Sequence, residues 1–213
     1  IYIAKTIPVR NTKMIIIYSG MVHGDYTLSS APQRIKDFGN PPKANDTLKK
    51  LLGTTPLLTP SLVNSAFNKR FAIINIWRSI SDEGPVQNFP LAFCDGQTVR
   101  PEDLVTFEIH YADRIGENYF SKFRPEQEWF FYPFMTKDEI VFIKQWDSIG
   151  QLAQSNGKKF DIQGEDCTFS FHSAFKDPNC SSTAPDRISI EVRLIAFFDD
   201  DLAELEQQQQ AKL

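Results

Sequence analysis

Short runs of alternating apolar and polar residues dominate the chain from Phe71 to Phe198. Successive side chains of a β-strand point to opposite faces, so this alternation predicts strands that bury one face. Gly, Pro and Asp separate the runs, and such a succession of short strands is typical of a sandwich or a barrel. The predicted strands are RFAIINIWRSI, PLAFCD, DLVTFEIHY, ENYFSKF, EWFFYPF, EIVFIKQWD, CTFSFHSAF and RISIEVRLIAFF. Two earlier segments rich in β-branched residues, IYIAKTIPV and KMIIIYSGMVHGD, also predict strands.

Two helices are expected between these early strands and Phe71. The first begins in LSSAPQRIKDF, where Ser29 or Ser30 is a good N-cap and Pro32 falls in the first turn. The second begins in TPSLVNSAFNKR, where Thr59 and Pro60 repeat the same signal. The chain is therefore expected to be mainly β with flanking helices.

The domain organisation is simple. Residues 1–213 are interpreted as a single domain, long enough to bury a sizeable core. Residues 37–62, rich in Pro, Gly and Asn, are expected to form a mobile lid or linker, and residues 199–213 a polar tail. Thr136 and Glu139 form a capping-box pattern that predicts one turn of helix.

Composition narrows the function classes. The chain has 41% hydrophobic residues and 18 Phe, which argues against disorder. Its net charge of −4 and its dispersed Lys and Arg give no footprint for nucleic acid or for an anionic membrane. No apolar run approaches the roughly 20 residues of a membrane helix. Three cysteines without a CxxC pair favour a reducing, cytoplasmic setting, whereas nothing indicates the oligomeric state.

The chemistry concentrates on the histidines, of which there are three. His23 and Asp25 are two residues apart, so on one strand both side chains face the same point. A second histidine from a distant strand would complete a 2-His-1-carboxylate face, which holds Fe(II) and leaves coordination positions open. His172 ends a predicted strand beside the last strand and is a better third ligand than His110, which is expected to cap or pack. The alternatives are a chance H-x-D pair and an ordinary strand-end histidine.

The last predicted strand has two different faces. One face is wholly apolar and comprises Ile188, Ile190, Val192, Leu194, Ala196 and Phe198. The other comprises Arg187, Ser189, Glu191, Arg193, Ile195 and Phe197, and is interpreted as the lining of a pocket that binds an anion. The planar guanidinium of Arg187 or Arg193 suits one carboxylate of a dicarboxylate. The alternative is that both arginines form cross-strand ion pairs with Glu191 between them.

Other residues are candidates for ligand contacts. Arg78, beside Trp77, is interpreted either as a carboxylate clamp or as a structural cation–π partner. Ile195 and Phe197 share the arginine face and are candidate substrate contacts, with barrel filling as the alternative. In the aromatic cluster RPEQEWFFYPFM, most of which is expected to be core, Tyr132 or Trp129 is a candidate to border the substrate.

Several sequence blocks together resemble the CmcJ-like hydroxylase/desaturase family, of the fungal secondary-metabolite type. The blocks are HGD followed by SSAPQR, IWRS, PLAFCD, EWFFYPFMTKDE, HSAFKDP and DRISIEVR. The resemblance implies a double-stranded β-helix, a jelly-roll or cupin-like barrel, and a non-haem Fe(II)/2-oxoglutarate-dependent oxygenase that uses O2. It implies that His23, Asp25 and His172 bind the iron and that an arginine of DRISIEVR binds 2-oxoglutarate. Members carry a longer segment before H-x-D, which leaves open that the chain lacks an N-terminal portion.

The expected function is therefore C–H oxidation, by hydroxylation, desaturation or ring closure, of a small, amino-acid-derived secondary metabolite. Two alternatives stay open at this point. One is a cupin-type metal dioxygenase that needs no 2-oxoglutarate, and the other is a non-catalytic β-sandwich that binds a ligand.

Overall fold

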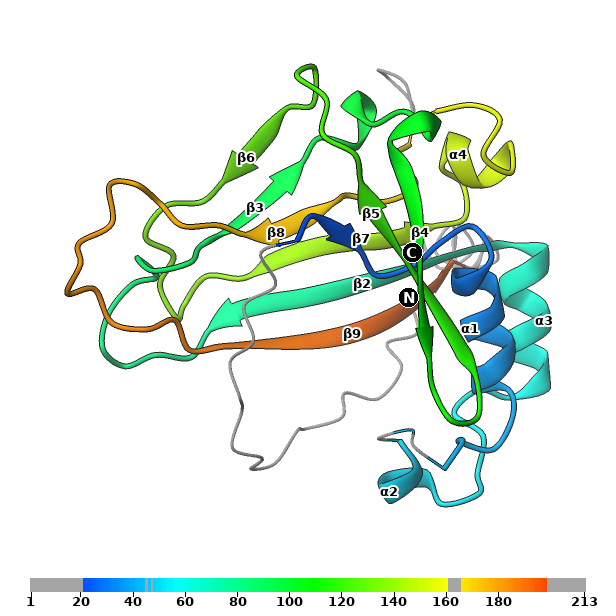
Figure 1. Ribbon diagram of the computed structural model, residues 1–213. Helices are drawn as coiled ribbons and strands as arrows, with labels where there is room; N and C mark the ends of the chain where they lie inside the picture. The colour runs from blue at the N-terminus through cyan, green and yellow to red at the C-terminus, as the bar shows by residue number, and fades with distance from the viewer. Residues whose placement is uncertain (1–20, 45, 47, 161–165, 199–213) are drawn as a thin grey trace, which may run out of the picture.

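The computed structural model describes residues 21–44, 46, 48–160 and 166–198 (Figure 1). These residues form two antiparallel sheets. The larger sheet contains, in spatial order, β4 (Leu104–His110), β5 (Ile115–Ser121), β1 (His23–Gly24), β8 (His172–Ala174), β3 (Leu91–Cys94) and β6 (Trp129–Phe131). The smaller sheet contains β7 (Val141–Asp147), β2 (Arg70–Ser79) and β9 (Ser189–Phe198). The helices are α1 (Ser30–Phe38), α2 (Lys49–Leu52), α3 (Pro60–Asn68) and α4 (Gln151–Gln154), with 3-10 turns at Gly96–Thr98 and Pro101–Asp103.

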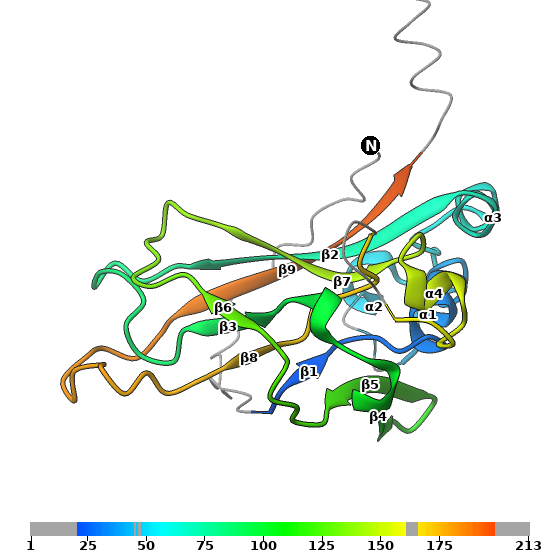
Figure 2. The same cartoon turned by 90° about the horizontal axis from the view of Figure 1, so that it is seen from above.

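The two sheets form two layers, and α1, α3 and α4 gather at one end of them (Figure 2). Each strand pairs antiparallel with its neighbours in the order given. The prediction of a mainly β chain with flanking helices is confirmed. In the part of the chain that is described, no helix is long and apolar enough to cross a membrane.

Both predicted helix starts are confirmed. The first helix begins at Ser30, directly after Ser29. The second begins at Pro60, and the Oγ1 atom of Thr59 accepts a hydrogen bond of 3.3 Å from the Leu62 amide. The prediction of a helical turn at Thr136 is wrong. Its amide donates to the Glu139 carboxylate at 2.8 Å, but the backbone there forms only a turn before β7.

The expected lid at 37–62 contains α2 and is attached to the core, where Phe38 is buried. Leu48 and Leu58 are buried in the same hydrophobic cluster as Ile35 of α1. A lid role for the rest of this segment stays a prediction. The strand expected at IYIAKTIPV and the polar tail at 199–213 lie outside the described residues.

One segment crosses between the sheets, which shortens a predicted strand. Only His172–Ala174 of CTFSFHSAF pairs with β1 and β3. The residues just before it bond to β7 instead: the Asp147 amide donates to the Thr168 carbonyl and the Ser170 amide donates to the Lys144 carbonyl. The segment thereby links the two layers directly before His172.

The inward face of β2 divides the core into two apolar regions. Phe71 and Ile73 pack in the cluster below the helices, whereas Trp77 packs in a second cluster at the other end. Between them lies Asn75, which is fully buried. A polar side chain in such a position needs hydrogen-bond partners, and these lie at the candidate site.

Candidate metal centre

His23 and His172 lie directly opposite each other on the neighbouring strands β1 and β8. Their ring centroids are 4.5 Å apart, with the planes tilted by 52°. Asp25 follows two residues after His23, and its Oδ1 atom lies 3.7 Å from His23 Nε2. One ligand atom from each of the three residues lies within 4.8 Å of the other two. The structure thus brings together the three residues that the sequence singled out as ligands.

The hydrogen bonding of the imidazoles leaves lone pairs available. His23 Nδ1 lies 2.8 Å from the Met21 carbonyl oxygen, which can only accept, so Nδ1 carries the proton. Nε2 then presents its lone pair towards Asp25. His172 is buried, and its Nδ1 atom has no hydrogen-bond partner of good geometry among the residues that the structure describes. Burial lowers the pKa of His172 to about 4, so the ring is neutral at pH 7.

Within the described part of the chain, hydrogen bonds and an ion pair hold one oxygen of the Asp25 carboxylate. Its Oδ2 atom accepts a hydrogen bond of 3.2 Å from Asn75 Nδ2 and forms an ion pair with Arg193 Nη2. Its amide donates to Gln145 Oε1 at 3.3 Å. Oδ1 is the oxygen that faces His23. Two neutral imidazoles and a carboxylate oxygen are a donor set that fits Fe(II) or a similar divalent cation.

Arg193 uses each of its guanidinium nitrogen atoms within the protein. Nε donates to Asn75 Oδ1 and Nη1 to the Tyr26 hydroxyl, both at 3.0 Å, and Nη2 contacts Asp25. Glu191 lies on the other side of Asn75 and accepts a hydrogen bond from its amide. Burial, and next the nearby charge of Asp25, raise the pKa of the Glu191 carboxyl.

Sequence reasoning missed Asn75, Tyr26 and Gln145. Asn75 carried a usable signal, because it is the single polar residue inside the apolar run AIINIW. Gln145 carried a weaker signal, because Lys144 stands beside it in the run VFIKQW. Tyr26 carried no such signal, because tyrosines are common in apolar clusters.

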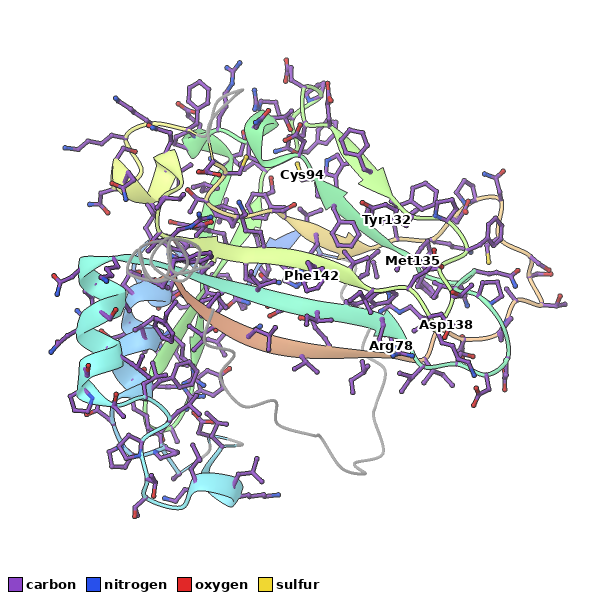
Figure 3. The ribbon with its side chains drawn as sticks, turned by 180° about the vertical axis from the view of Figure 1, so that it is seen from behind. Arg78, Cys94, Tyr132, Met135, Asp138 and Phe142 are labelled. Carbon is purple, nitrogen blue, oxygen red and sulfur yellow. The ribbon has the colours of Figure 1, made fainter. Side chains whose placement is uncertain are left out.

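The other two predicted arginines have contacts elsewhere than at the three ligands. Arg187 follows the same face of the chain as Arg193, and its Nη1 atom donates to the Phe89 carbonyl at 2.6 Å. Its guanidinium lies 5.5 Å from the ring centroid of Trp77. Arg78 is three residues from Asn75 and lies on the opposite face of β2, near Asp138 at the end of the strand far from the helices (Figure 3).

The predicted substrate contacts are not beside the histidines either. Ile195 and Phe197 are buried in the core cluster below the helices, which is the barrel-filling alternative. Tyr132 follows β6, is 60% exposed, and its ring lies 6.3 Å from that of Phe93 (Figure 3). His110 lies on β4, where its Nε2 atom contacts Glu108 at 2.8 Å.

A pocket of about 350 Å³ reaches the centre from the side of α1 and the β4–β5 hairpin. Asp25 and Arg193 form its inner end. Its rim carries both charges and hydrogen-bonding groups, among them Arg34, Arg114 and Glu117. The Glu117 carboxylate accepts hydrogen bonds from Ser29 and Thr27, which lower its pKa. The pocket therefore adjoins the centre on the Asp25 side, and its lining residues include neither of the two ligand histidines.

The fold and this centre define a class of oxidoreductase. The family model described as "Oxidoreductase/YMDC permease-like domain" matches residues 18–197, so the chain belongs to this family. Among curated relatives, aspirochlorine biosynthesis protein N of Aspergillus oryzae is 31% identical over 144 residues, which are 66% of this chain and 54% of that protein. The hydroxylase/desaturase asaB of Aspergillus flavus is 27% identical over 192 residues, 84% of this chain and 74% of that protein.

A solved structure agrees with these relatives. The iron and alpha-ketoglutarate-dependent endoperoxidase NvfI is 25% identical and superimposes with a TM-score of 0.62. The match covers 88% of this chain and 57% of that protein, so the chain spans little more than half the length of several proteins it resembles. The resemblance to the hydroxylase/desaturase family and the expected fold class are confirmed.

Proposed function

We propose that the chain is the core of an Fe(II)/2-oxoglutarate-dependent oxygenase that oxidises a C–H bond of a small molecule. The observation that carries the proposal is the convergence of His23, Asp25 and His172 between the two sheets. The relatives support it, because their names describe hydroxylase/desaturases and an iron-dependent endoperoxidase. Fe(II) bound here would activate O2, with 2-oxoglutarate as the co-substrate that donates electrons.

Different residues of the chain would bind the cation and orient its ligands. His23 Nε2, a nitrogen of His172 and Asp25 Oδ1 would hold the cation, while Asn75 and Arg193 hold the other oxygen of Asp25. His172 stays neutral because it is buried, so it does not lose its lone pair to a proton at pH 7. The preorganised ligands need little rearrangement to bind a cation.

Among the three candidate arginines, Arg187 is the one we assign to the far carboxylate of 2-oxoglutarate. Arg193 already donates to Asp25, Asn75 and Tyr26, so binding a second carboxylate would break those bonds. Arg78 lies on the outer face of β2. Arg187 precedes β9, and its guanidinium lies beside the ring of the buried Trp77, where it can bind a carboxylate through two parallel hydrogen bonds.

The substrate we propose is a small, amino-acid-derived secondary metabolite that reaches the centre through the pocket beside Asp25. The mixed charges of this pocket support a polar substrate that carries both a basic and an acidic group. Hydroxylation, desaturation and ring closure would differ only in how the substrate is held. The free thiols of Cys94 and Cys180 support a cytoplasmic, reducing setting.

The test is turnover of 2-oxoglutarate without added substrate, a slow side reaction expected of this class. Purified protein, Fe(II), ascorbate and 2-oxoglutarate should consume O2 and release succinate, and His172→Ala should abolish both. Arg187→Ala should raise the KM for 2-oxoglutarate at least tenfold, whereas Arg78→Ala should leave it unchanged. Oxygen uptake that is independent of 2-oxoglutarate would favour a cupin-type dioxygenase instead. If the protein shows no oxygen uptake and binds no cation, the remaining explanation is a non-catalytic protein that binds a ligand.

A further inference from the structure

We propose that Asn75 is a positioning residue that orients the Asp25 carboxylate for cation binding. This inference rests on the proposed metal centre. Asn75 lies in the middle of β2, and its side chain is fully buried. Its neighbours along the same face, Ile73 and Trp77, are apolar and pack in the core. An amide in such a place is costly unless it is satisfied, so its partners indicate its role.

The Asn75 amide contacts three charged groups at once. Nδ2 donates to Asp25 Oδ2 at 3.2 Å and to Glu191 Oε1, while Oδ1 accepts from Arg193 Nε at 3.0 Å. Only a side chain with two N–H donors and an acceptor can satisfy two carboxylates and a guanidinium together. An aspartate here would accept only, and it would add a third negative charge beside the other two.

The consequence concerns which oxygen of Asp25 is available. Asn75 holds Oδ2 directly, and it also holds Arg193, the second partner of that oxygen. The first interaction on Oδ2 depends on the amide directly, and the second depends on it in part, because the Tyr26 hydroxyl also holds Arg193. Oδ1 is left facing His23 Nε2, where it can bind a cation. Without the amide, Oδ2 keeps only its ion pair with Arg193, so the carboxylate would turn more easily about its terminal torsion and the three ligand atoms would converge less reliably.

The competing explanation is that Asn75 only satisfies a buried strand. In that case its loss would lower stability and leave cation affinity alone. Groups that orient a metal ligand typically contribute 10-fold to 100-fold in metal affinity, so the two explanations differ in a measurable quantity.

The experiment measures Co(II) binding to metal-free protein from the visible absorption of the bound ion, together with urea unfolding. Asn75→Leu keeps the number and branching of the side-chain heavy atoms but removes all three hydrogen bonds, and we expect the Co(II) Kd to rise about 10-fold to 100-fold with an altered absorption band. Ile76→Ala, on the outer face of the same strand, is the matched control. It should lower stability and leave the Kd within twofold of the wild type.

If Asn75→Leu does not fold, Asn75→Thr carries the test, since threonine suits a strand and keeps one hydroxyl donor. It should raise the Co(II) Kd about 10-fold. A folded Asn75 variant with an unchanged Kd and absorption band would overturn the inference while leaving the metal centre intact. A wild-type protein that binds no Co(II) would instead overturn the proposed function, and the inference with it.

Discussion

Gly150→Ala tests how tightly the segment before His172 is held. Gly150 is the N-cap of α4, with φ −60°, so an alanine could adopt its backbone conformation. The new Cβ, however, would meet the backbone N and Cα of Thr168 well inside van der Waals contact. Thr168 is fully buried, and its carbonyl accepts a hydrogen bond of 2.7 Å from the Asp147 amide. The methyl group must therefore displace the segment that carries His172.

The expected cost follows from this contact. Overpacking a well-filled site typically costs about 1–3 kcal/mol, and contact with backbone on a paired segment places this case near the upper end. Alanine also stabilises the fold by about 0.4–1 kcal/mol, because it reduces the conformational entropy of the unfolded chain. The net loss is then about 2 kcal/mol, which lowers the Tm of a chain of this length by about 4–8 °C. Because His172 moves with the segment, cation affinity should fall as well.

Urea unfolding followed by tryptophan fluorescence measures the stability, and a Co(II) titration measures the affinity. Gly116→Ala is the control, because its Cβ would lie 3.1 Å from Cε2 of the Tyr111 side chain, which is exposed and can turn aside. The control should change stability by less than about 1 kcal/mol. An unfolding midpoint for Gly150→Ala equal to that of the wild type would refute the reasoning.

Three further predictions concern charge and burial. In metal-free protein the pKa of His172 is ~6.5 in the unfolded chain and about 4 in the folded chain. The neutral ring therefore contributes about 3 kcal/mol to the free energy of unfolding above pH ~6.5, and this contribution should be lost as the pH falls through the window to about 4. Urea midpoints across this range should show a steeper slope for the wild type than for His172→Gln, and equal slopes would contradict the assignment. Arg70→Leu removes the bidentate partner of buried Asp147, whose contacts are 3.1 and 2.6 Å, and should cost about 2–3 kcal/mol after allowing for the partial exposure of Arg70. Adding Asp147→Asn should restore part of this loss in urea unfolding, and a loss from Arg70→Leu below about 1 kcal/mol would count against a buried ion pair. Burial raises the pKa of the Cys94 thiol to about 11, so iodoacetamide at pH 8 should label Cys180 while Cys94 resists until urea unfolds the chain; equal rates, read by mass spectrometry, would argue against its burial.

Strand alternation predicted that His23 and Asp25 lie on one side, and the structure places their side chains together although Asp25 follows the end of β1. Pairing β1 with β8, which brings His172 opposite His23, is a long-range contact that no local pattern specifies. The alternation in β9 likewise predicted that Arg193 shares a face with Ile195 and Phe197. In the structure this face points inward, because Arg193 lies opposite Asn75 of β2.

The same reasoning was insufficient for β2. Its two faces are both largely apolar, so the pattern did not reveal that Asn75 points inward and Arg78 outward. The strand expected over CTFSFHSAF was too long because Thr168 and Ser170 bond to β7. Both outcomes depend on which sheet covers which face, and tertiary packing decides this.

The central claim is that two imidazoles and one carboxylate bind a single Fe(II). The most direct measurement is the iron content of protein reconstituted with Fe(II) without oxygen and then desalted. We predict one iron per chain in the wild type and in the control Arg78→Ala, and a loss of bound iron in each of His23→Ala, Asp25→Ala and His172→Ala. Full iron content in any of these three folded variants, or no iron in the wild type, would contradict the account.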